Sequence, residues 1–292
     1  MFKSCLICTD FTDGLHRLIH FVPSLAKGGL QRIIFVHSVP LWEEGKVPRV
    51  DEEQIQIAQD KLAAATSQVP AGVDVEIKVP SGRPTEMIPQ LIEDCQPEVL
   101  FTGTPTRNLM QETLFGSTTV GLTKSTTIPF MILRPQLIST YTREELELRC
   151  QHLWSYLLIP YDDGEAARYL IEQIKEYAQN KHENFPKRCM LIWVITSGGR
   201  REIPLEYKRQ EAEERLAVVK EELEACGLEV NLDIRTGNPL QEILDAALTF
   251  DISAIATAAV NRSALVNFTS PSFANEVLRH SWFPVLFFSP KR

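Results

Sequence analysis

Two glycine-containing segments in the N-terminal half have the composition of a phosphate-binding loop. Gly103 ends an apolar run, and Gly116, Ser117 and Thr118 follow a polar loop at the start of the next helical segment. A glycine lets the backbone approach a phosphate with no Cβ in the way. A helix N-terminus presents unpaired N–H groups, and a hydroxyl there adds a donor or caps the helix. These residues indicate a candidate anion site.

Three other patterns have simpler interpretations. Cys5 and Cys8 form a CxxC pair within a predicted strand, which points their side chains to opposite faces and disfavours a shared metal. His16 and His20 are one helical turn apart, but no third ligand is apparent. Residues 196–202, TSGGRRE, lack the Lys-Ser/Thr ending of a nucleoside triphosphatase loop. We expect reduced structural cysteines, surface histidines, a surface loop and no metal.

The composition limits the classes of partner. The 292 residues carry a formal net charge of -8, which argues against a general affinity for nucleic acid, because that affinity comes largely from Lys and Arg. No apolar run reaches the roughly 18 residues that span a bilayer, and the N-terminus lacks a secretory signal. We therefore expect a cytoplasmic protein with neither nucleic acid nor membrane as a partner.

Strand and helix patterns alternate along the first half. Short apolar, β-branched runs occupy 4–9, 32–39, 73–79, 98–103 and 129–134, and stretches of helical spacing separate them. One predicted helix, beginning in RPTEMIPQLIEDC, has Thr85 as its expected N-cap. Alternation of this kind predicts right-handed crossovers and a mostly parallel sheet covered on both faces.

The same order begins again at residue 156. Runs at 156–162, 189–197, 228–237, 252–259 and 284–290 repeat the pattern, and VDVEIKVPSGRPTEMIPQLI matches LEVNLDIRTGNPLQEILDAA. At the join, Thr142 with Glu145 has the spacing of a capping box. The prediction is an α/β protein with two tandem open parallel five-stranded sheets and helices on both faces: domain 1 at 1–136, a linker helix at 137–154 and a degenerate domain 2 at 155–292.

The spacing of the glycine segments resembles that of the universal stress protein family. From Gly103 the chain runs through two residues to Thr106, then nine residues to Gly116 and Ser117, and Pro129 precedes the last strand of this half. Nucleotide-binding members of that family carry Gly-x-x-Gly, nine residues and Gly-Ser or Gly-Thr between the fourth and fifth strands. They also place an Asp after the first strand, as Asp10 is placed here. The resemblance covers both halves, so the chain resembles a tandem member of the adenine nucleotide alpha hydrolase-like fold.

The resemblance implies a binding site for ATP, ADP or AMP, with or without Mg²⁺. In the family the first-strand Asp helps to hold the adenosine, the end of the second strand flanks adenine, and the loop residues hold ribose and phosphates. Carried over by position, these roles fall on Asp10, Val36, His37, Gly103, Thr106, Arg107, Gly116, Ser117 and Thr118.

Two departures from the family pattern matter. Thr106 replaces the second glycine, where its side chain would either crowd the triphosphate path or strain a backbone of positive φ, so we expect a degraded but usable site that favours AMP or ADP over ATP. In the second half Asp162 is retained, but Ala258, Asn261, Pro271 and Ser272 occupy the positions of Gly103, Thr106, Gly116 and Ser117. We expect no phosphate cradle there, because the glycines are lost and proline removes an N–H group.

The expected function is that of an adenine-nucleotide-binding stress protein with an unidentified protein client. No nucleophile elbow, paired carboxylates or Walker lysine is recognisable in the sequence, so no catalytic residues are assigned. Slow ATP hydrolysis, a nucleotide-independent interaction scaffold and a homodimer are left open.

Overall fold

The computed structural model describes residues 1–42, 48–103, 122, 126–179, 187–196, 204–259 and 273–289. The chain divides into two compact units, Phe2–Gln151 and His152–Arg292. None of the described helices combines the length and the apolar composition needed to cross a lipid bilayer.

The first unit is an open parallel sheet in the order β3-β2-β1-β4-β5. All five predicted strands are confirmed, with ends that differ by at most three residues from the predicted ones. They are β1 (Ser4–Cys8), β2 (Arg32–Val36), β3 (Asp74–Lys78), β4 (Val99–Gly103) and β5 (Phe130–Leu133).

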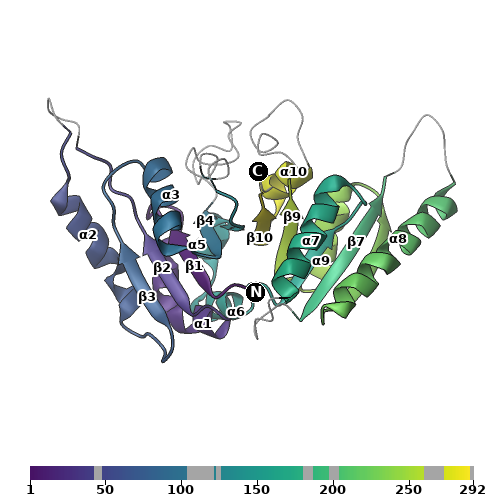
Figure 1. The fold of residues 1–292 in the computed structure, drawn as a ribbon, viewed down its shortest axis with the longest axis horizontal. Coiled ribbons are helices and arrows are strands. Elements are labelled where there is room, and N and C mark those ends of the chain that lie inside the picture. Colours follow the sequence, from purple (N-terminus) through teal and green to yellow (C-terminus); the bar gives the residue numbers. More distant parts are fainter. Residues whose placement is uncertain are drawn as a thin grey trace. The chain divides into compact units, whose positions relative to one another are not determined.

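Helices cover both faces of this sheet (Figure 1). Right-handed crossovers require the connections after β1 and β2 to share one face and the connection after β3 to cross the other. Contacts between η1 and η2 agree with that arrangement. The helices are η1 (Leu15–Phe21), α1 (Val22–Lys27), α2 (Glu52–Leu62), η2 (Ala63–Thr66), α3 (Pro84–Cys95), α5 (Pro135–Thr140) and α6 (Arg143–Gln151).

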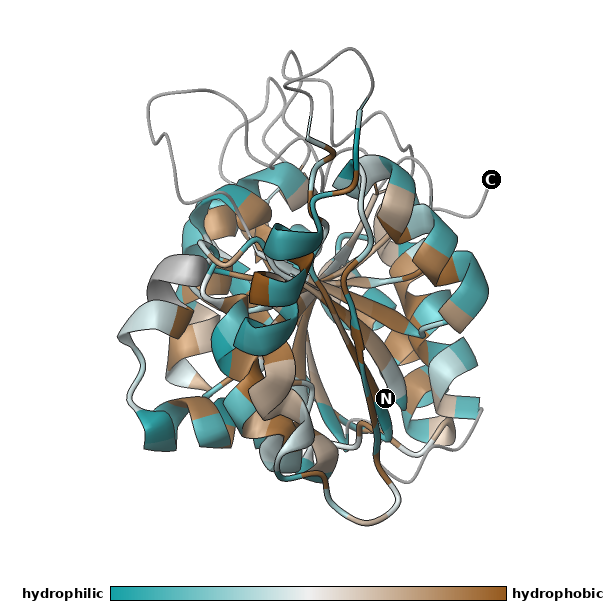
Figure 2. Cartoon of the chain, turned by 90° about the vertical axis from the view of Figure 1, so that its left-hand side faces the viewer, coloured by the Kyte–Doolittle hydropathy of each residue, from teal (hydrophilic) through white to brown (hydrophobic). Residues whose placement is uncertain are grey.

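The core of the first unit lies between the sheet and its helices. Strands β1, β2 and β4 contain runs of consecutive buried residues, as expected where both faces of a parallel sheet are covered. Phe35, Phe101 and Phe130 are fully buried. Figure 2 shows the apolar strands inside and the mixed colouring of the helices, whose polar sides face outward.

The start of α3 differs from the prediction. Thr85 lies inside the helix; the N-cap is Arg83, which makes no side-chain capping hydrogen bond. Pro84 occupies the first helical turn, where its fixed φ suits the helix and its missing N–H costs nothing. Pro84, rather than the hydroxyl of Thr85, therefore determines where the helix starts.

The segment after β5 packs on the first unit. The predicted capping box is confirmed, since Glu145 accepts from the Thr142 N–H at 2.8 Å and Thr142 Oγ1 accepts from the Glu145 N–H at 3.3 Å. Arg17 on η1 donates to the carbonyl oxygens of Ile138 and Tyr141. A Cβ on Gly28, at the end of α1, would lie 2.5 Å from the Cys150 carbonyl oxygen, so α1 and α6 approach closely.

The second unit repeats the sheet in the order β8-β7-β6-β9-β10, again with parallel pairs. All five strands predicted for this half are present. The elements are β6 (Tyr156–Pro160), α7 (Glu165–Gln179), β7 (Arg188–Ile195), α8 (Leu205–Ala225), β8 (Glu229–Thr236), α9 (Pro239–Thr249), β9 (Ala254–Ala258), α10 (Phe273–His280) and β10 (Val285–Phe288).

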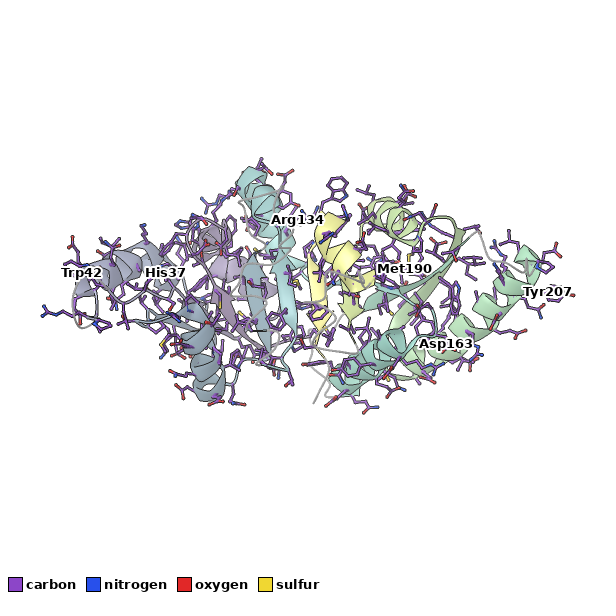
Figure 3. All side chains as sticks on the ribbon, turned by 90° about the horizontal axis from the view of Figure 1, so that it is seen from above. His37, Trp42, Arg134, Asp163, Met190 and Tyr207 are labelled. Atoms are coloured by element: carbon purple, nitrogen blue, oxygen red, sulfur yellow. The ribbon has the colours of Figure 1, made fainter. Side chains whose placement is uncertain are left out.

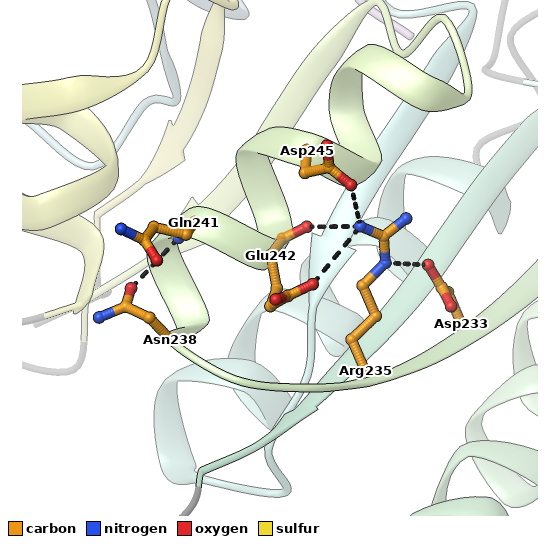
Figure 4. A network of polar contacts seen from close by, with 6 residues as sticks. All are labelled: Asp233, Arg235, Asn238, Gln241, Glu242 and Asp245. Carbon is orange, nitrogen blue, oxygen red and sulfur yellow. Dashed lines mark hydrogen bonds and ion pairs between the residues drawn. The ribbon is translucent and has the colours of Figure 1, made fainter.

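An ionic network fixes the outer strand of this unit to a helix (Figure 4). Arg235 on β8 lies 2.7 Å from Asp233 and 2.5 Å from Asp245, with Glu242 at 3.6 Å. Only 17% of the Arg235 side chain is exposed. Since Glu242 and Asp245 belong to α9, the network joins that helix to the edge of the sheet.

Backbone conformation repeats along with the strand order. Gly82 and Gly237, 155 residues apart, have φ of 144° and 156°. At the same spacing, Gln96 and Asp251 follow α3 and α9 with φ of 48° and 52°. Left-handed residues at matching positions show that the two units share loop geometry as well as strand order.

Candidate functional site

The candidate site of the first unit begins where β1 ends. Asp10 Oδ1 accepts hydrogen bonds from the Thr12 N–H at 2.7 Å, the Thr12 hydroxyl at 2.8 Å and the Asp13 N–H at 2.9 Å. The side chain is exposed, and Oδ2 has no hydrogen-bond partner among the residues that the structure describes. One carboxylate oxygen therefore shapes the turn and the other is available to a ligand donor.

The turn brings two rings together. Phe11 has a left-handed backbone, with φ of 64°, and its N–H donates to Thr9 Oγ1 at 3.0 Å. Its ring lies 4.3 Å from that of His37, measured between centroids. Lys61 Nζ, from α2, lies 4.8 Å from the centroid of Phe11. A bulky residue at positive φ is costly and is held by its surroundings, which here include the Asp10 turn.

The imidazole of His37 has a defined tautomer. Nδ1 lies 2.9 Å from the carbonyl oxygen of Thr9, and a carbonyl can only accept, so Nδ1 carries the proton. In the neutral ring Nε2 is then an acceptor. The hydrogen bond ties the end of β2 to the end of β1 and orients the ring.

The buried carboxyl group of Asp13 stabilises the turn through hydrogen bonds. Asp13 accepts from the Thr9 hydroxyl at 2.8 Å and from the Leu15 N–H at 2.9 Å, and 9% of the residue is exposed. Burial raises the pKa of Asp13 to about 6, and the nearby charge of Asp10 acts in the same direction. Asp13 therefore changes charge near neutral pH.

A cavity of about 300 Å³ adjoins the ring pair. Its walls include Phe11, His37, Trp42, Ile57 and Lys61. Trp42 is 55% exposed, and Figure 3 shows it near His37 at the same end of the first unit. The wall thus combines aromatic rings with charged groups, and its Phe11 directly follows Asp10 in the chain.

The structure brings together part of the predicted residue set. Asp10 and His37 lie at adjoining strand ends, and Val36 is buried, with its carbonyl oxygen accepting from the Thr9 N–H at 3.0 Å. Gly103 ends β4, the other neighbour of β1. Thr106, Arg107, Gly116, Ser117 and Thr118 lie outside the described residues.

Sequence reasoning missed Phe11, Asp13 and Lys61. Phe11 follows the predicted Asp10 directly, so its position in the chain was the available signal. Nothing in the chain around Asp13 distinguishes it from an exposed acidic residue. Lys61 comes from a helix some fifty residues further on, and only the fold places it over Phe11.

The second unit keeps the same turn with different chemistry. Asp162 Oδ1 accepts from the Gly164 N–H at 2.9 Å, as Asp10 accepts from Thr12, and Asp163 has φ of 59° where Phe11 has 64°. Asp163, labelled in Figure 3, makes ion pairs with Arg168 at 2.9 Å and with Arg215 at 2.8 Å. The aromatic platform of the first unit is thus replaced by an ion-pair cluster.

Four further positions of the second half bear on the prediction that it lacks a phosphate cradle. Ala258, which takes the place of Gly103, is buried. Asn261, Pro271 and Ser272 lie outside the described residues, and so do residues 197–202 of the TSGGRRE segment. The prediction about the cradle therefore stays a prediction.

The cysteines take no part in this arrangement, whereas His16, one of the two helical histidines, borders it. All six cysteine thiols are free. Burial raises the pKa of Cys5 and Cys8, and it raises that of Cys150 to about 12. Burial also lowers the pKa of His16, whose ring contacts Phe11 edge-on. Within the described ranges, no group of three His, Cys, Asp or Glu side chains could hold a metal ion.

Two parallel sheets of this order, each with an acidic turn after its first strand, define a tandem α/β protein with candidate ligand sites at the carboxyl ends of its strands. The family model of the universal stress protein family matches residues 1–134 and again 156–289. The chain belongs to the universal stress protein family and carries two copies of its domain.

Solved structures agree with this fold. A universal stress protein from Archaeoglobus fulgidus DSM 4304 superposes with a TM-score of 0.67 at 18% identity, over 99% of each chain. A putative universal stress protein from Pseudomonas aeruginosa UCBPP-PA14 gives a TM-score of 0.57 at 16% identity, over 99% of this chain and 94% of the other. No curated protein sequence matches the chain significantly. At these identities the likeness concerns the fold alone.

Proposed function

We propose that the first domain binds an adenine nucleotide, ATP, ADP or AMP, and that the chain acts as a nucleotide-responsive stress protein. The observation that carries the proposal is the Asp10 turn, which holds one carboxylate oxygen inside the loop and leaves the other free on an exposed side chain, one residue before the Phe11 ring that packs against His37. This turn lies where β1 separates β2 from β4, the point of an open parallel sheet at which ligands bind.

Each described residue has a distinct part in the proposal. Asp10 Oδ2 accepts hydrogen bonds from ribose hydroxyls, and a charged acceptor makes the stronger kind of hydrogen bond. The Phe11 and His37 rings, with the adjoining cavity, give the base an apolar surface. Gly103 places no side chain at the end of β4. The phosphate contacts are assigned from the sequence alone, with or without Mg²⁺, to Arg107, Gly116, Ser117 and Thr118. Thr106 favours the nucleotides with fewer phosphates, AMP and ADP.

Calorimetric titration of the full chain with AMP, ADP and ATP, each with and without Mg²⁺, tests the proposal. Asp10→Asn keeps an oxygen for the turn but removes the charge. We expect it to weaken binding about tenfold or more, because a hydrogen bond to a charged group contributes about 1.5–3 kcal/mol. Asp162→Asn makes the same change in the second domain, where the same turn occurs, and should leave nucleotide affinity unchanged.

Two outcomes would contradict the proposal: no heat of binding with any of the nucleotides at millimolar concentration, or equal losses in both variants. The first would favour a nucleotide-independent scaffold. Phosphate release measured on the same preparations separates binding from slow hydrolysis. Mass spectrometry of small molecules released from the denatured protein shows which nucleotide it carries from the cell.

We also propose that the chain binds one protein partner in addition to the nucleotide. Nucleotide binding at the strand ends would alter the surface that a client protein in the cytoplasm recognises. Co-purification with and without added nucleotide tests this step, and sedimentation under the same conditions tests whether the chain forms a homodimer.

A further inference from the structure

The second unit holds a cavity of about 520 Å³ at the carboxyl ends of its strands. It lies where the first unit carries the candidate nucleotide site, yet its walls differ. They come from the ends of β6, β7 and β9 and from three helices. The wall residues include Asp162, Ala166, Leu170, Ile243, Ala258 and Phe273.

The wall is apolar and contains no cation. Alanine, leucine, isoleucine, valine, proline and phenylalanine side chains make up most of it, and no Lys, Arg or His occurs among its described residues. Tyr161 also borders the cavity, but its hydroxyl donates its proton to Asp163 at 3.0 Å and has none left to donate to an anion. Two cations at the turn, Arg168 and Arg215, are both paired with Asp163. An anionic ligand would therefore meet no positive charge from the described residues of the wall.

One polar group of the wall has a defined ligand preference. Asp162 Oδ1 accepts from the Gly164 N–H, and Oδ2 has no hydrogen-bond partner in the part of the chain that the structure describes. A carboxylate accepts hydrogen bonds and repels negative charge. Asp162 therefore favours a ligand that offers a hydroxyl or amine donor, and it disfavours phosphates and carboxylates, while the apolar wall disfavours charge of either sign.

The volume fits a compact organic molecule. Ligand cavities of globular proteins generally enclose about 300–1,000 Å³ and combine apolar walls with a few placed polar groups. An apolar cavity of about 150 Å³ already takes up benzene. We propose that the second domain binds an uncharged, largely apolar small molecule about the size of two or three fused rings, through apolar contact and one hydrogen bond donated to Asp162.

Fluorescence of the full chain with N-phenyl-1-naphthylamine, an uncharged apolar dye, tests the proposal. The dye should brighten in the cavity, and naphthalene-1-methanol should displace it at least about tenfold better than 1-naphthoate, a difference of about 1.4 kcal/mol. The two competitors share the same rings and differ in charge. Asp162→Asn should narrow this difference, because it removes the repulsion but keeps an acceptor.

The site of binding is assigned with a matched pair of variants. Ala166→Trp places an indole in the cavity and should abolish the dye signal, whereas Ala217→Trp makes the same change on the exposed face of α8 and should leave it unchanged. Circular dichroism checks that each variant folds, and Ala166→Leu, which fills less space, replaces Ala166→Trp if the larger residue prevents folding.

Three results of these measurements would overturn the inference, and a fourth concerns nucleotides. They are no dye signal in the native protein, an equal signal after the cavity is filled, and displacement by 1-naphthoate as strong as by the alcohol. Displacement of the dye by ATP or AMP would also overturn it, because the second domain would then be a nucleotide site. Failure of nucleotide binding to the first domain leaves this test unaffected, since the two sites are probed by different ligands and variants.

Discussion

The ring of Phe11 lies against the imidazole of His37, with centroids 4.3 Å apart and planes inclined by 36°. The two residues are 26 positions apart in the chain and meet because the Thr9 carbonyl accepts from His37 Nδ1 while the Thr9 hydroxyl accepts from the Phe11 N–H. Thr9 thus joins the ends of β1 and β2 and presents both rings beside Asp10.

Loss of the Phe11 ring should weaken nucleotide binding. Phe11→Ala removes the platform but keeps a Cβ at the left-handed position, and we expect affinity to fall about five- to tenfold, since an aromatic contact contributes about 0.5–1.5 kcal/mol beyond its buried area. Phe11→Tyr keeps the ring and should retain affinity. Calorimetry with the preferred nucleotide measures both. Equal affinity in Phe11→Ala and the native chain would show that the base binds elsewhere.

Stability of the first unit should depend on pH through Asp13. Because its folded pKa of about 6 exceeds the ordinary 3.8, the folded state binds the proton more tightly than the unfolded state. The resulting stabilisation is complete below about pH 3.8 and is lost as the pH rises through about 6. The loss amounts to at most about 3 kcal/mol.

Urea unfolding at a series of pH values between 4 and 7.5 measures this effect. In Asp13→Asn the carboxyl is absent, so the decline of stability across this range should be smaller than in the native chain. Asp94→Asn, an exposed change on α3, should keep the native decline. If Asp13→Asn and the native chain give parallel curves, Asp13 is not the group that titrates.

Gly28→Ala tests the contact between α1 and α6. The backbone of Gly28 has φ of −70°, which alanine adopts freely, so the effect of the substitution is steric. Its Cβ would lie 2.5 Å from the Cys150 carbonyl oxygen, and we expect a loss of about 1–3 kcal/mol from the overpacked contact. Lys27→Ala, one residue earlier and exposed, is the control. If the two variants have similar thermal midpoints, α6 does not lie as close to Gly28 as the structure shows.

Asp251→Gly should stabilise the second unit. Asp251 follows α9 with φ of 52°, a conformation that costs a non-glycine residue about 1 kcal/mol or more and glycine almost nothing. Thr249→Gly, two residues earlier and still helical, should instead destabilise by a similar amount. Tryptophan fluorescence in urea follows both, since Trp154, Trp193 and Trp282 lie in this unit. A lower midpoint for Asp251→Gly would contradict the expectation.

Much of the fold could be predicted from the sequence, because its signals are local. Apolar runs that alternate with stretches of helical spacing predicted all ten strands. The capping box at Thr142 and Glu145 is present as predicted. The helix start at Thr85 was wrong because a proline at the first turn competes with a hydroxyl one residue later. Gly82 and Gly237 could be recognised as turn residues, whereas the left-handed Gln96 and Asp251 could not.

The sequence by itself determined two tandem parallel sheets and marked Asp10 and Asp162 as the residues after their first strands, since strand period, helix period and turn residues are properties of neighbouring positions. Only the tertiary structure decided that Phe11 meets His37, that Asp13 is buried and that the second unit holds an apolar cavity. These features join residues from separate strands and helices. Their energies come from burial and distance, which exist only once the chain has packed.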